Sequence, residues 1–127
     1  MNRLTSLSKA RLIAQVAAEK KGENIVIMDM QKISTMCDWF VLVSASSSRR
    51  INAISNTIQR KLSKEGISPA RVEGKQSQYW VLLDFEDVVV HVFYEQIRDF
   101  YGLERLWSEA PIERFKNKCL VKTSPEE

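Results

Sequence analysis

Apolar residues recur at intervals of three and four over residues 47–65, a spacing typical of an amphipathic helix. The residues that share its apolar face are Ile51, Ile54, Ile58 and Leu62. Gly66 ends this helix, since glycine favours the C-terminal cap. A comparable pattern predicts a first helix over about residues 6–21, with Gly22 as its cap.

Five segments are predicted as strands from their apolar runs: residues 24–28, 39–44, 70–73, 79–83 and 88–93. The second is apolar throughout, so both of its faces are expected to be covered. The last two form a hairpin across the acidic residues 84–87, and a short helix over residues 94–101 follows. The predicted fold class is therefore α/β: a single domain with a mixed five-stranded sheet packed by helices.

A length of 127 residues with 44% hydrophobic residues supports one domain with one core. Cys37 and Cys119 have no companion at metal-binding or redox spacing, which favours reduced thiols in a cytoplasmic protein. No apolar run is long enough to cross a membrane. The first eighteen residues hold basic residues and no acid, as organellar presequences do, but their apolar spacing favours a core helix.

The net charge of +3 permits contact with an RNA-rich environment without requiring it. Lys and Arg are spread along the chain, with small excesses at residues 60–64 and 114–122. Because no basic stripe stands out, direct RNA binding is a weak interpretation and any RNA contact is expected to be peripheral.

Residues 79–107 contain eight of the eleven aromatic residues. Large rigid aromatics beside charges are typical anchors of protein interfaces. Some of Trp80, Tyr94, Tyr101 and Trp107 are therefore expected on a partner surface, and the others in the core. No nucleophile elbow, phosphate loop or metal-ligand spacing occurs, so the pattern indicates binding rather than catalysis, with no metal and no cofactor.

Several polar residues allow more than one interpretation. Residues 46–48 are serines before a helix, and capping of that helix is favoured over an anion site. The carboxylates of Asp84, Glu86 and Asp87 allow three interpretations. A solvated acidic turn is favoured, an acidic patch that binds a partner comes next, and a metal site is least favoured. His91 is expected to be a hydrogen-bonded structural or interface residue rather than a catalytic base.

Several blocks of the chain form a specific pattern. They are DWFVLVS at residues 38–44, then Ser46, Arg49 and Ala53-Ile54, then Glu73-Gly74, WVLLD at 80–84, DVVVHVF at 87–93, and finally Arg98, Phe100-Tyr101, Leu103-Glu104, Leu106-Trp107 and Ala110-Pro111. Together they resemble the ribosomal silencing factor family, also called RsfS or Iojap, over about residues 6–111. Three departures affect local turns: Ala45 and Glu86 replace glycines usual in the family, and Arg50 replaces glutamine.

The resemblance implies a fold related to nucleotidyltransferases without their catalytic residues. It implies a domain over residues 1–111 and a partly disordered C-terminal extension over residues 112–127. It also implies a cytoplasmic repressor of translation that acts in the stress of nutrient limitation. Such a factor binds the large ribosomal subunit through the universal ribosomal protein fourteen, blocks joining with the small subunit, and in some members dimerises when free.

The family match carries the partner-binding role onto eight residues: Trp80, Leu82, Asp84, His91, Arg98, Tyr101, Glu104 and Trp107. The ribosomal partner is basic, so an acidic and aromatic hairpin suits it. The alternative function is a metal-dependent nucleotidyltransferase that uses the carboxylates of Asp84 and Asp87.

Overall fold

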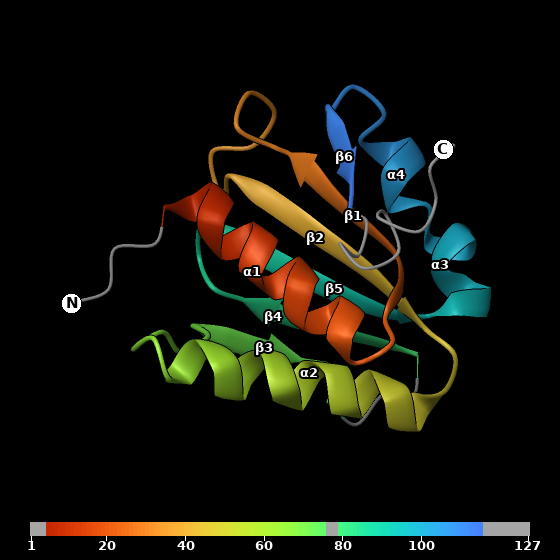
Figure 1. Cartoon of the computed structure of the whole chain (residues 1–127). Helices are drawn as coiled ribbons and strands as arrows, with labels where there is room; N and C mark the ends of the chain where they lie inside the picture. Colours follow the sequence, from red (N-terminus) through yellow and green to blue (C-terminus); the bar gives the residue numbers. More distant parts are fainter. Residues whose placement is uncertain (1–4, 76–78, 116–127) are drawn as a thin grey trace, which may run out of the picture.

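One six-stranded mixed sheet forms the centre of the molecule, and α1 and α2 lie side by side across one of its faces (Figure 1). The computed structural model describes residues 5–75 and 79–115, and the side chains of residues 99–101 and 106 are outside that description. The elements in chain order are α1 (Ser6–Glu19), β1 (Glu23–Asp29), β2 (Trp39–Ala45), α2 (Ser48–Ser63), β3 (Arg71–Glu73), β4 (Trp80–Asp84), β5 (Val88–Tyr94), α3 (Glu95–Tyr101), α4 (Leu103–Leu106) and β6 (Ile112–Arg114).

The strands lie in the order β3-β4-β5-β2-β1-β6. β2 and β5 are parallel, and the other described pairs are antiparallel. Parallel neighbours need a long crossover, and the segment from α2 through β4 provides it. The predicted mixed α/β fold is confirmed, and the two most apolar strands occupy the centre of the sheet.

The sheet has one strand more than the five predicted, because Ile112–Arg114 forms β6 at the edge beside β1. All three residues of β6 are exposed. Backbone pairing at an edge requires no apolar alternation, so hydrophobic patterning gave no sign of this strand. Residues 116–127, the part of the predicted extension that follows, lie outside the described residues.

Helix α2 follows its predicted pattern closely. Its apolar residues Ile51, Ile54, Ile58 and Leu62 are at most 1% exposed. The Ser47 side chain accepts a hydrogen bond from the Arg50 backbone N–H at 3.1 Å, which satisfies one of the donors left free at a helix start. The capping interpretation of the serine cluster is thus confirmed for Ser47.

Helix α1 ends differently from the prediction. The left-handed position belongs to Lys21, with φ of 68°, and not to Gly22. The backbone N–H groups of Gly22 and Lys21 donate to the carbonyls of Ala17 and Ala18, the pattern of a Schellman motif. Gly22 is needed for another reason: a Cβ there would lie 2.7 Å from a methyl carbon of Val43.

Side chains of successive strand residues point to opposite faces, so the sheet separates two clusters of buried residues. The cluster under α1 and α2 includes Ile27, Val43 and Val90. The cluster on the other face includes Met28 and Phe93, and Leu103 and Trp107 from the α4 region pack against it. The helical segment after β5 therefore covers only part of this second face.

Candidate partner-binding face

Five half-buried side chains lie on the sheet face opposite α1 and α2. They are Phe40, Trp80, Leu82, Asp84 and Val89, and we call this surface the open face. The strand register places them together: Asp84 and Phe40 flank Val89 on neighbouring strands, and Trp80 and Leu82 precede Asp84 at alternate positions of β4. A partly exposed patch of apolar side chains with a carboxylate at its margin has the anatomy of a protein interface.

Three side chains of the open face, Phe40, Trp80 and Val89, pack against the same buried cluster as the helical segment after β5. Trp107 and Leu103 pack on the cluster that contains Met28 and Phe93, and Ile33 from the β1–β2 connection joins them. The main contacts of the described helical segment on this side are with β2 and β5 and not with β4. Apolar side chains there remain accessible to a partner.

His91 lies in the middle of this surface, between Leu42 and Leu82 in the strand register. The Trp80 indole Nε1–H donates a hydrogen bond to His91 Nδ1 at 3.2 Å. The Phe40 ring meets the imidazole edge-on, with centroids 4.8 Å apart, and the Phe93 ring is parallel to it within 9°. His91 is therefore a hydrogen-bonded member of an aromatic cluster, as predicted for a structural histidine.

Burial lowers the pKa of His91 from its usual value of 6.5 to about 4, because the charged imidazolium loses its hydration. The ring is consequently neutral near pH 7. Since Nδ1 accepts the bond from Trp80, the proton of the neutral ring is on Nε2. Nε2 is buried and has no hydrogen-bond partner in the described part of the molecule.

The acidic turn between β4 and β5 is held by its own carboxylates. Asp84 Oδ1 accepts a bond from the Glu86 backbone N–H at 2.8 Å, and Asp84 Oδ2 lies 3.6 Å from the Arg71 guanidinium. Glu86 adopts the left-handed conformation with φ of 77°, a conformation that glycine adopts more readily than glutamate. Phe85, although it lies in the turn, is 3% exposed and belongs to the core.

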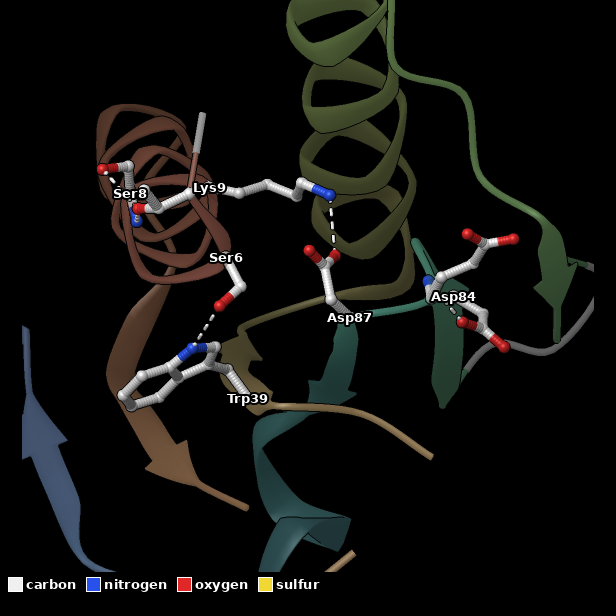
Figure 2. Close-up of polar contacts among 8 residues, drawn as sticks. Ser6, Ser8, Lys9, Trp39, Asp84 and Asp87 are labelled. Atoms are coloured by element: carbon white, nitrogen blue, oxygen red, sulfur yellow. Dashed lines mark hydrogen bonds and ion pairs between the residues drawn. The ribbon is translucent and has the colours of Figure 1, made fainter. Parts of the chain in front are cut away.

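Asp87 ties the hairpin to α1. Its carboxylate accepts a charge-assisted bond from Lys9 Nζ at 2.6 Å, and Figure 2 shows the lysine reaching across from the helix. Beside this pair, the Trp39 indole N–H donates to Ser6 Oγ at 3.0 Å. Both contacts join the first turns of α1 to the ends of central strands.

These contacts change the interpretation of the acidic turn. The carboxylates of Asp84 and Asp87, on which the alternative nucleotidyltransferase function depends, are both engaged within the protein. Across residues 5–75 and 79–115, no three His, Cys, Asp or Glu side chains gather in a way that could hold a metal ion.

Arg98 and Glu104, two of the predicted partner-binding residues, form an internal clamp. Arg98 is 6% exposed, and its Nε and Nη2 donate to the two carboxylate oxygens of Glu104 at 3.1 and 3.3 Å. Its Nη1 donates to Ser44 Oγ at 2.8 Å and to the Asn24 carbonyl. Asn24 has φ of 49° within a bulge of β1, so the guanidinium satisfies a carbonyl that the regular ladder leaves free.

The predicted site residues therefore separate into groups. Trp80, Leu82 and Asp84 lie on the open face. His91 is buried beneath this surface and accepts a hydrogen bond from Trp80. Trp107 is half-buried against the same cluster as Trp80. The side chain of Tyr101 lies outside the described residues.

Sequence reasoning missed Phe40 and Val89 as members of this surface. Val89 sits on the same side of β5 as His91, and alternation along that strand was a usable signal. Phe40 required the parallel register of β2 against β5, which places it beside Val89. Local sequence does not specify the pairing of strands so far apart in the chain.

Residues 46–48 and two tyrosines, Tyr79 and Tyr94, line a pocket of about 340 Å³ at the start of α2. Ser47 already caps the helix there. No helix within the described ranges has both the length and the apolar character needed to traverse a membrane.

The fold and the open face define a small mixed α/β protein with a surface suited to binding another macromolecule. A family model described as ribosomal silencing factor during starvation matches residues 3–127. The chain belongs to this ribosomal silencing factor family.

Individual relatives agree with this assignment. The ribosomal silencing factor RsfS of Bacillus subtilis is 36% identical over 80% of this chain and 86% of its own. A crystal structure of a protein from Chromobacterium violaceum superposes with a TM-score of 0.79 at 32% identity, covering 82% of this chain and 87% of that one. A more distant mouse relative, 22% identical over 91% of this chain and 52% of its own, is named mitochondrial assembly of ribosomal large subunit protein 1.

Proposed function

We propose that this protein binds the large ribosomal subunit through the universal ribosomal protein fourteen and thereby blocks joining with the small subunit. Translation is then repressed when nutrients are limiting. The observation that carries the proposal is the open face, an apolar and aromatic patch bordered by Asp84 on one side of the sheet. The name of the mouse relative, which refers to the large subunit, supports the choice of subunit.

The mode of action we propose is steric and involves no catalysis. A half-exposed patch with its indole and imidazole fixed by a mutual hydrogen bond presents a rigid surface, so little conformational entropy is lost on binding. The carboxylate of Asp84 at the margin favours a basic partner. We propose in addition that the protein is cytoplasmic and that it forms a homodimer when it is not bound to the ribosome.

The test is co-sedimentation with purified large subunits, small subunits and assembled ribosomes, followed by a subunit-joining assay. We expect binding to free large subunits, little binding to small subunits, and reduced joining when the protein is added first. Equal binding to both subunits, or normal joining at saturating protein, would contradict the steric mechanism.

A variant links this activity to the open face. Leu82→Lys places a charge at the centre of the patch, and we expect large-subunit binding to weaken by roughly 2 kcal/mol, about thirtyfold. Ser8 is an exposed residue of α1, on the opposite side of the sheet. Ser8→Lys adds the same charge there and is expected to bind normally. Asp84→Asn keeps an acceptor for the Glu86 N–H and removes the negative charge together with the ion pair to Arg71, so it tests the electrostatic contribution of this carboxylate.

Unaltered binding by folded Leu82→Lys would exclude the open face as the interface. Folding is checked by circular dichroism and thermal melting of each variant. Loss of binding in Ser8→Lys as well would indicate a nonspecific effect of charge.

A further inference from the structure

The outer surface of α2 is strongly basic. We define the basic helix face by five residues: Arg49, Arg50, Arg60, Lys61 and Lys64. All are exposed except Arg50, which is half-buried. The sequence contains no Asp or Glu between Asp38 and Glu65, so no acid lies within the helix to offset this charge.

Within residues 5–75 and 79–115, the ion pairs do not use the cations of this surface. The ion pairs found among the described residues use Lys9, Arg11, Arg71 and Arg98, and none of them uses a side chain of α2. Lys75, from the turn after β3, donates to Asn56 Oδ1 of α2 at 2.6 Å and brings a further cation to the helix. The surface therefore concentrates positive charge that a chain-wide net charge of +3 conceals.

The arrangement along the helix is suited to a linear array of negative charges. Arg49, Arg60 and Lys64 are separated by eleven and four residues, which places them on one side of the helix. At a rise of about 1.5 Å per residue, they span roughly 22 Å. Phosphates on one strand of a duplex follow each other every ~3.4 Å along the axis, so several lie within reach of this stripe.

Two features separate a phosphate backbone from other acidic partners. The apolar side of α2 is fully buried in the core, so the helix has no apolar face to insert into a membrane surface. Residues 46–64 contain no aromatic side chain on which single-stranded bases could stack, and Tyr79 and Tyr94 lie beside the start of α2, at the other end of the helix from Arg60 and Lys64. Cations without stacking platforms are typical of contact with the backbone of a nucleic-acid duplex.

We propose that the basic helix face binds the phosphate backbone of double-helical RNA. Helix α2 packs on the sheet face opposite the open face, as the two buried clusters show, so both surfaces are accessible at the same time. This inference goes beyond the proposed function, because it concerns a different surface and does not require the ribosomal protein partner. Arg60 and Lys64 contribute charge to the contact and no sequence specificity.

The test is fluorescence anisotropy with a labelled RNA duplex over a series of salt concentrations. The variant Arg60→Gln/Lys64→Gln removes two cations from the basic helix face. Its matched control, Lys32→Gln/Arg114→Gln, removes two exposed cations from the β1–β2 connection and β6, with the same change in net charge. A single-stranded RNA and polyglutamate of equal charge serve as competing ligands.

We expect the wild-type protein to bind the duplex in a salt-dependent manner. In the α2 variant the slope of log affinity against log salt should decrease by about 1.8, if each lost phosphate contact contributes about 0.9 as it does on B-form DNA. The affinity should fall on the order of tenfold or more at about 0.1 M salt, and the control should change little.

Three results would overturn the proposal: no wild-type binding to the duplex at low salt, an equal loss in the control, or equally tight binding of single-stranded RNA or polyglutamate. A failure of this proposal can be distinguished from a failure of the proposed function. Leu82→Lys should bind the duplex normally, and Arg60→Gln/Lys64→Gln should still bind the isolated basic ribosomal protein.

Discussion

At the scale of single residues, His91 shows how burial determines the chemistry of a side chain. Histidine is the only side chain whose usual pKa lies close to neutral pH, so an exposed histidine would change its charge near about pH 6.5. His91 instead accepts a bond from Trp80 and is packed between Phe40 and Phe93. It serves as a neutral hydrogen-bonding element beneath the open face.

The lowered pKa predicts that stability decreases in acid. The folded protein holds His91 neutral down to about pH 4, whereas the unfolded chain takes up a proton near pH 6.5. Stability is therefore lost as pH falls from 6.5 towards 4, by roughly 3 kcal/mol in total, and this contribution stays constant below that range.

The variant His91→Asn checks this prediction, because an amide oxygen can replace Nδ1 as acceptor for the Trp80 indole and does not titrate. Urea denaturation at a series of pH values between 7 and 4 is the measurement. We expect the variant to be less stable at pH 7 and its stability to depend less on pH. Identical pH profiles for the two proteins would show that His91 is not the titrating group.

At the scale of secondary-structure elements, α3 and α4 depend on tertiary contacts. Helices of seven and four residues are too short to be stable in isolation. The clamp of Arg98 on Glu104, Ser44 and Asn24 joins these helices to the ends of β1 and β2. It thereby places Trp107 beside the open face.

Arg98→Lys should destabilise the protein by roughly 2–3 kcal/mol, because lysine keeps the charge but cannot bond Glu104 with two donors while it also reaches the bulge. Arg71→Lys, which alters an ion pair whose arginine side chain is 59% exposed, is the matched control. We expect that change to cost less than about 1 kcal/mol. The change in the free energy of unfolding is measured for both variants from the midpoints of urea denaturation, provided that the dependence on urea concentration is the same as in the wild type. Similar losses of stability in the two variants would show that the contacts of Arg98 have no special role.

Prediction at this scale was most successful where packing follows a local pattern. The helix over residues 47–65 was recognised because its apolar spacing is the spacing of its buried residues. The edge strand β6 was missed because its three residues are all exposed and pair only through the backbone. The end of α1 was assigned to Gly22, whereas Lys21 takes the left-handed position and Gly22 allows the close approach of Val43.

At the scale of the whole molecule, the sheet separates two surfaces of different chemistry. The open face is apolar, aromatic and bordered by a carboxylate, and the basic helix face carries a cluster of cations on the opposite side. A protein partner and an RNA partner could thus be held on either side of one small domain.

This separation predicts that changes on the two surfaces are energetically independent. The effects of Leu82→Lys and Arg60→Gln/Lys64→Gln on large-subunit binding should add to within about 0.5 kcal/mol, as is usual for distant sites without shared partners. Measuring the affinity of both variants and of their combination completes the cycle. A much larger deviation would mean that the two surfaces contact one continuous partner or influence each other through the sheet.

The sequence by itself determined the class of fold, the positions of the main helices and strands, and the family, because periodicity and local motifs are properties of neighbouring residues. The tertiary structure decided which polar residues pair within the protein and which lie at its surface. Lys9 and Asp87 are 78 positions apart in the chain yet form an ion pair, and Arg98 reaches 74 positions back to the carbonyl of Asn24. Such contacts depend on strand register and helix packing, which no local pattern encodes. For that reason Arg98 is buried and paired with the half-buried Glu104, while Phe40 joins Trp80 and Leu82 on the open face.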